Sequence, residues 1–166
     1  MPKTISVKKI IPLKAITKKS APVQPVVVKK PSKPTSLVKG KKVVIPVKTA
    51  KKVKADLEKV DMGLLKGDAH MRWMDHLSVL NEEIEIIQKS SSIEKQRISF
   101  ALFNDAFYKS MKIFGLDSGT VYYQYCPMAN GDEGAFWFSK ISEIKNPYFG
   151  DEMLKCGETK ETLEFK

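Results

Sequence analysis

The first part of this chain lacks acidic and aromatic residues. Residues 1–55 hold sixteen lysines and no acidic side chain, a charge of +16, and residues 1–50 hold no aromatic one. Residues 56–166 carry all nineteen acidic residues against thirteen basic ones, which gives −6. A proline-interrupted segment of this kind buries too little apolar surface to offset the entropy lost on ordering. We therefore predict a disordered basic tail at residues 1–48 and a folded domain at residues 49–166.

Arginine is also missing from the tail. Lysines neutralise phosphates and release counterions, so nonspecific nucleic-acid binding through the tail stays open as an alternative function. Sequence-specific recognition is not expected, because the tail offers no guanidinium for bidentate contacts and no aromatic ring for base stacking.

Long hydrophobic runs are absent as well. No stretch of about 18 apolar residues occurs, so no membrane-spanning helix is predicted. A secretory signal needs an apolar core of roughly 7–15 residues, whereas the longest near the start runs from Ile10 to Leu13 and contains a proline. We expect the chain as given to lack an export signal.

Motifs of hydrolases and transferases are missing too. The sequence has no G-x-S-x-G, no glycine loop of the phosphate-binding kind and no Cys/His/Asn set with recognisable spacing. We expect a non-enzymatic protein.

Apolar residues recur at helical spacing through the middle of the chain. A short helix is predicted near residues 50–65, and a longer one over residues 69–89 after Asp68 as its N-cap. The stripe of this second helix comprises Trp73, Leu77, Leu80, Ile84 and Ile87.

A third helix follows after three serines. Ser91 and Glu94 read as a capping box, and Gly115 marks the C-terminal end of this helix. Helices joined by so short a turn should pack antiparallel. The predicted fold is mainly α: an antiparallel helical hairpin or three-helix bundle with a small, loop-rich, two-stranded segment at the C-terminus.

The period drops to two near the C-terminus. Residues 121–126 and 158–165 alternate as strands do. Pairing of these two segments would bring Cys126 close to Cys156.

Only two cysteines are present, and each has a methionine nearby. Cys126, Met128, Met153 and Cys156 could supply a soft sulfur site, which favours Cu(I) over hard cations. His70 could add a nitrogen donor, with His76 as the weaker choice. Zinc is conceivable on ligand count, but the spacing fits no zinc-finger pattern. The alternative is a structural disulfide, which for a loop of this length contributes roughly 3–4 kcal/mol.

Several separate motifs resemble those of a bacterial domain-of-unknown-function family, in the family's order. They are Val60-Asp-Met-Gly-Leu-Leu65, His70, Trp73-Met74, Gln96-Arg97, Tyr122-Tyr-Gln-Tyr-Cys-Pro-Met-Ala-Asn130, Gly134-Ala-Phe-Trp137, Glu143-Ile-Lys-Asn-Pro-Tyr-Phe-Gly150 and Met153-Leu-Lys-Cys-Gly-Glu158. The resemblance covers roughly residues 50–165. Members of that family occur as small exported proteins and as the C-terminal appendage of periplasmic adaptor subunits in copper/silver and other heavy-metal efflux systems.

The resemblance implies a helical domain of the periplasm or cell envelope that handles heavy metals. Its partner would be an efflux adaptor or a metallochaperone, and its ligands would be Cys126, Met128, Met153 and Cys156, with His70 next. Family members usually begin with a signal peptide and another long helix, where this chain has its lysine-rich tail. We interpret residues 1 to about 45 as a replaced leader or the product of a misassigned start or reading frame.

Overall fold

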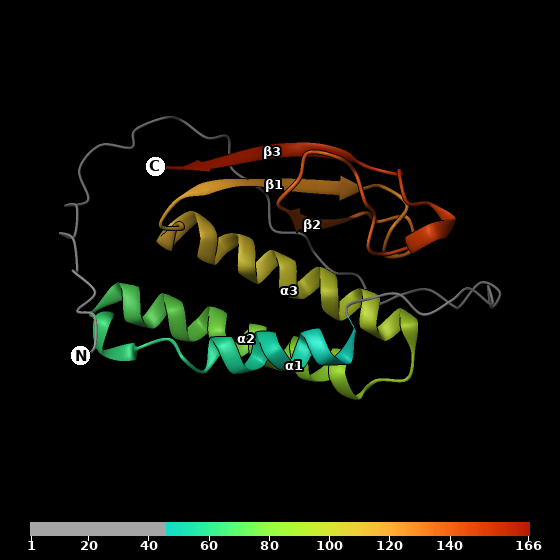
Figure 1. Ribbon diagram of the computed structural model, residues 1–166. Coiled ribbons are helices and arrows are strands. Elements are labelled where there is room, and N and C mark those ends of the chain that lie inside the picture. Colours follow the sequence, from blue (N-terminus) through green and yellow to red (C-terminus); the bar gives the residue numbers. More distant parts are fainter. Residues whose placement is uncertain (1–45) are drawn as a thin grey trace, which may run out of the picture. The chain divides into compact units, whose positions relative to one another are not determined.

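The computed structural model describes residues 46–166, which form three helices followed by a three-stranded antiparallel sheet (Figure 1). The helices are α1 (Val47–Leu57), α2 (Asp68–Lys89) and α3 (Ile93–Phe114). The strands are β1 (Gly119–Cys126), β2 (Ala135–Ser139) and β3 (Glu158–Phe165), and two 3-10 turns, η1 (Met62–Leu64) and η2 (Gly150–Glu152), lie in the connections. Helices followed by a small sheet are thus confirmed. The predicted disordered tail lies almost wholly in residues 1–45, outside the described residues. The same holds for the nonspecific nucleic-acid binding considered for this tail.

Helix α1 is shorter than the predicted helix of residues 50–65, because it ends at Leu57. The chain then turns at Asp61, whose carboxylate accepts a hydrogen bond from the Gly63 amide at 2.8 Å. This local bond competes with a continuing helix. Val60 and Leu64, which fall within the range of the predicted helix, are exposed.

Helix α2 carries the predicted stripe on its buried side. Leu80, Ile84 and Ile87 are fully buried, so the 3.6-residue period identified the core face correctly. The predicted start is wrong by one residue: Gly67 occupies the N-cap position, and Asp68 is the first helical residue.

Helix α3 returns along α2 after a turn of three residues, and the two helices run in opposite directions (Figure 1). Its N-cap is Ser92, whose hydroxyl accepts a hydrogen bond from the Lys95 amide at 3.4 Å. The predicted cap, Ser91, is therefore wrong by one position. Gly115 ends α3 as expected, with a φ of 69° that favours glycine.

The sheet has the strand order β2-β1-β3, with β1 antiparallel to both neighbours. The predicted pairing of β1 with β3 is confirmed, with Tyr125 opposite Glu158. The expectation of two strands is wrong, because the Ala135–Ser139 segment forms a third strand, in which Ala135 pairs with Cys126.

Aromatic rings join the sheet to α3. Tyr108 of α3 stacks on Tyr123 of β1 at 4.4 Å between ring centroids, and Phe107 meets Phe138 of β2 edge-on at 5.3 Å. Helix α3 therefore lies between α2 and the sheet. Within residues 46–166, no helix combines the length and the apolar composition needed to cross a membrane.

Candidate metal centre

Cys126 is the last residue of β1, the central strand of the sheet. Its side chain is 0% exposed and belongs to the core cluster that includes Ala135, Trp137 and Tyr148. The first cysteine is therefore held by a strand paired on both sides, in apolar surroundings.

Cys156 lies in the turn that leads from η2 into β3 and is half-buried. The next residue, Gly157, has a φ of +140°. A Cβ at Gly157 would lie 2.7 Å from the Tyr125 carbonyl oxygen and 2.8 Å from the Trp137 ring. Only glycine lets the chain pass this close to the end of β1, and that approach delivers Cys156 to Cys126.

Asn146 closes the loop that carries Cys156. Its side-chain Nδ2 donates to the Cys156 carbonyl oxygen at 2.9 Å, and its own amide donates to the Leu154 carbonyl oxygen at 2.8 Å. Its Oδ1 accepts from the Tyr148 amide at 2.8 Å. Since Asn146 is almost completely buried, these bonds fix the backbone of Cys156 against the loop.

The two sulfur atoms are in contact. Cys126 Sγ and Cys156 Sγ are 3.4 Å apart, and both cysteines are free thiols. Two sulfur ligands of one tetrahedral ion, each about 2.3 Å from it, lie roughly 3.8 Å apart. A disulfide requires about 2.05 Å. The observed separation is nearer to the spacing of two metal ligands, and either product needs only a small movement. We call these two residues the dithiol pair.

The contact also affects the acidity of the pair. A hydrogen bond with Cys126, and to a smaller extent burial, raises the pKa of the Cys156 thiol above its usual value. Because a metal binds the thiolate form, binding here would release protons.

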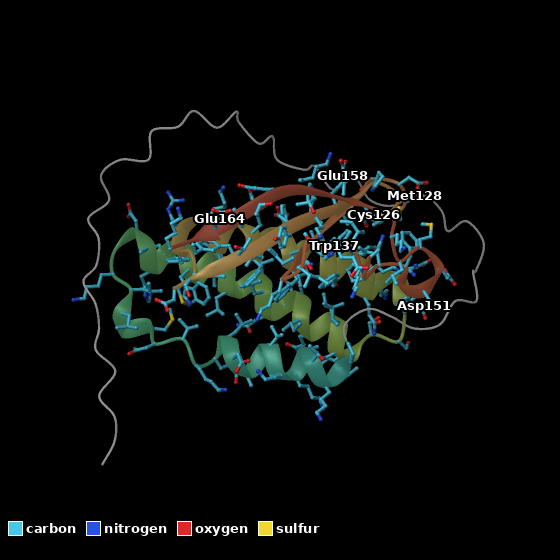
Figure 2. The ribbon with its side chains drawn as sticks, turned by 45° about the horizontal axis from the view of Figure 1, so that its top comes forward. Cys126, Met128, Trp137, Asp151, Glu158 and Glu164 are labelled. Carbon is cyan, nitrogen blue, oxygen red and sulfur yellow. The ribbon has the colours of Figure 1, made fainter. Side chains whose placement is uncertain are left out.

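The two methionines flank the dithiol pair in different ways. Met128 follows Cys126 by two residues in the turn after β1, and its side chain is 48% exposed. Met153 is half-buried, and its carbonyl oxygen accepts a hydrogen bond from the Cys156 amide at 3.0 Å. Figure 2 shows Cys126, Met128 and Asp151 at one end of the sheet, with Glu164 toward the other. Both thioethers therefore belong to the chain segments that form this end.

His70 lies at the other end of the helices. His70 lies one turn before Trp73, whose ring centroid is 5.7 Å from that of Phe114. Tyr148, in the loop that carries Cys156, packs instead on Phe100, with 5.4 Å between the ring centroids. Phe100 and Phe114 are separated along α3 by about 21 Å, at 1.5 Å per residue. The structure therefore does not bring His70 to the dithiol pair.

His76 is also remote from the cysteines, since its Nδ1 lies 2.9 Å from Ser110 Oγ between α2 and α3. The described part of the chain contains no group of three or more His, Cys, Asp and Glu side chains that could hold a metal ion. A Cys₂His₂ zinc site is thus not assembled. The donors that the structure does bring together are two thiols, with thioethers nearby, and this set suits a soft ion.

Asn146 and Gly157 lie within two of the motifs that carry the family resemblance, but the sequence assigns neither of them a role in the site. Asn146 stands before a proline, which signals a turn but not a buried amide. Gly157 directly follows a cysteine, and only the strand pairing reveals the close approach that it permits.

Comparison with known proteins gives one match. A family described as "Protein of unknown function (DUF3347)" matches residues 36–119. No curated protein and no solved structure matches the chain. The matched residues include the three helices and stop at the first residue of β1, before both cysteines. Since the match covers about half of the sequence, the chain belongs to this family of proteins of unknown function.

Proposed function

We propose that this protein is a non-enzymatic accessory domain of the cell envelope that binds Cu(I) through the thiolates of Cys126 and Cys156. The observation that carries the proposal is the 3.4 Å contact between the two sulfur atoms, which lie on segments 30 residues apart. Thiolate and thioether ligands select soft monovalent copper over hard cations. The resemblance to appendages of heavy-metal efflux adaptors supports the location and the link to efflux.

The two sulfurs have different tasks in this proposal. Cys126 lies in the apolar core and provides a fixed ligand at the end of a central strand. Cys156 is partly accessible and provides the ligand that a donor or acceptor protein meets first. Met128 and Met153 would supply thioether ligands to complete the coordination of Cu(I). Transfer to an efflux adaptor or a metallochaperone would proceed by ligand exchange at the accessible side.

A competition titration tests this proposal. The reduced, full-length protein is titrated with Cu(I) under anaerobic conditions in the presence of a chromogenic Cu(I) chelator. We expect one equivalent to be withdrawn from the chelator, and we expect Cys126→Ser and Cys156→Ser each to abolish this competition. Met71→Leu is the matched methionine control, since Met71 is an exposed residue at the start of α2. Equal competition by the wild type and both cysteine variants would refute the proposal.

A structural disulfide is the second function that an observation favours. The full burial of Cys126 against Cys156 suits a permanent bridge that closes a 30-residue segment, worth roughly 3–4 kcal/mol. The domain would then be an interaction module without a metal. A thiol count on the native protein that finds no free cysteine, together with no Cu(I) uptake after reduction, would support this function.

A further inference from the structure

The two sulfurs of the dithiol pair differ in their access to solvent. Cys126 is 0% exposed, since it lies at the end of a strand with a neighbour on each side. Cys156 lies in the turn before β3 and keeps part of its surface in contact with water. A reagent in solution can therefore reach Cys156 while the fold is intact, whereas it reaches Cys126 only through Cys156 or after local opening.

We infer that the dithiol pair reduces low-molecular-weight disulfides in a fixed order, with Cys156 as the attacking sulfur and Cys126 as the resolving sulfur. In the first step, Cys156 loses its proton to water, and the resulting thiolate, a minor form at neutral pH because Cys126 raises the pKa of this thiol, attacks one sulfur of the external disulfide. That disulfide bond breaks, a mixed disulfide forms on Cys156, and the first small thiolate leaves and takes a proton from water.

The second step takes place inside the protein. Cys126 gives its proton to the departing small thiolate, and its sulfur attacks Cys156 Sγ. The Cys126–Cys156 bond forms as the mixed disulfide breaks. In sum, the two protein thiols are oxidised by two electrons, and one external disulfide is reduced to two thiols.

The geometry favours the second step over the first. The resolving sulfur already lies 3.4 Å from the sulfur that it attacks. The Asn146 side chain donates a hydrogen bond of 2.9 Å to the Cys156 carbonyl oxygen and so restrains this loop. The attacked sulfur therefore stays beside Cys126 without a search through loop conformations. Such prepositioning replaces a bimolecular reaction by an intramolecular one. The mixed disulfide should therefore be short-lived in the wild-type protein.

The reaction would control the proposed metal site. Closure of the Cys126–Cys156 bond consumes both thiolates, so only the reduced protein would bind Cu(I). This consequence rests on the proposed function, whereas the order of attack rests on the contact and accessibility of the two thiols alone.

The test uses metal-free, reduced, full-length protein and oxidised glutathione, followed by intact mass spectrometry. We expect the wild type to lose two hydrogens without a lasting adduct. Cys126→Ser should accumulate one glutathione on Cys156, and folded Cys156→Ser should react slower by about tenfold or more. Modification of Cys156→Ser at the rate of Cys126→Ser, or a stable mixed disulfide on the wild type, would overturn the assignment.

A pulse of iodoacetamide on the reduced wild type avoids any folding defect of the variants. Trypsin separates the two thiols, because Cys126 falls within residues 113–140 and Cys156 within residues 156–160. We expect the 156–160 peptide to be alkylated first, whereas equal labelling of both peptides would contradict the assignment. Because no copper is present, a failure of the Cu(I) titration leaves this result unaffected, and the reverse also holds.

Discussion

The side chain of Asn146 donates a hydrogen bond of 2.9 Å to the carbonyl oxygen of Cys156. The same amide accepts a bond from Tyr148 through Oδ1, and its side chain is only 1% exposed. The buried side-chain amide of Asn146 therefore fixes the backbone of Cys156, the more accessible residue of the dithiol pair. In this fold, the geometry of the two sulfurs depends on a residue that is not itself one of the two cysteines.

Asn146→Ala should lower the stability of the domain and slow closure of the disulfide. Removal of the side-chain amide leaves the buried Tyr148 amide and the partly buried Cys156 carbonyl oxygen unpaired, at a cost of about 2–3 kcal/mol in the free energy of unfolding. Asn146→Asp retains the acceptor for the Tyr148 amide but loses the donor to Cys156. Both variants should therefore accumulate the glutathione adduct that the wild type resolves, as seen by intact mass spectrometry. Disulfide closure at the wild-type rate in both would contradict this role.

Gly157→Ala should destabilise the protein far more than Gly131→Ala. Both glycines have positive φ values, +140° and +67°, but a Cβ at Gly131 would meet no heavy atom within 4 Å. The control therefore carries only the backbone strain of about 1–2 kcal/mol. At Gly157 the Cβ would also meet the Tyr125 carbonyl oxygen at 2.7 Å, so a loss of about 3 kcal/mol or more is expected. Urea denaturation measures both, and equal losses would show that the close approach is unimportant.

Glu83→Gln should stabilise the protein at neutral pH and have little effect in acid. Glu83 is 8% exposed on α2, and its Oε2 finds no hydrogen-bond partner among the described residues. Burial raises the pKa of this carboxyl above its ordinary 4.5, against a smaller opposing effect of the Ser99 hydrogen bond. The native state therefore binds its proton more tightly than the unfolded state does.

The sign of the pH dependence follows from that difference. The contribution of Glu83 to stability is favourable below pH 4.5 and is lost as the pH rises through the folded pKa. Denaturation at several pH values should show that the free energy of unfolding of Glu83→Gln equals that of the wild type in acid and exceeds it increasingly toward neutral pH. Glu164→Gln, at an exposed position of β3, is the control and should show no such increase. A pH-independent difference for Glu83→Gln would refute the assignment.

Leu80→Ala should be strongly destabilising, because Leu80 of α2 is fully buried in the hydrophobic core. Truncation leaves a cavity, with an expected loss of about 2–5 kcal/mol. Leu64→Ala removes the same atoms from a side chain that is 74% exposed, and should change stability by less than about 0.5 kcal/mol. A comparable loss at Leu64 would mean that this residue is covered in solution.

The long helices could be predicted because their apolar residues repeat with the helical period along one face. The ends of the helices could not be predicted to the residue, since three consecutive serines offer equivalent caps and Ser92 rather than Ser91 is used. Strand β2 does not stand out in the sequence because its apolar residues occupy both faces: Phe138 packs on Phe107 of α3, and Trp137, the adjacent residue on the opposite face of the strand, is also buried. Such a strand lacks the alternation that reveals a half-exposed one.

The contact of the two cysteines could be predicted from the pairing of β1 with β3. The separation of His70 from the cysteines could not, because the sequence places His70 in the first turn of α2 but does not show that the loop carrying Cys156 packs near the start of α3, at the opposite end of the helices. Gly157 acts through its close approach to Tyr125 of β1 and Trp137 of β2, and Asn146 acts through the carbonyl oxygen of Cys156, ten residues further along the chain. Their roles emerge only once the loop is folded against β1.

X-ray absorption at the copper K-edge tests the central claim most directly. The sample is the reduced, full-length protein loaded with one equivalent of Cu(I), compared with the Cys126→Ser/Cys156→Ser double variant. We predict a first shell made of sulfur alone in the wild type, with fewer sulfur neighbours when Met128 and Met153 are replaced by leucine, and no retained copper in the double cysteine variant. A first shell of nitrogen or oxygen, or copper retained by the double variant, would contradict the account.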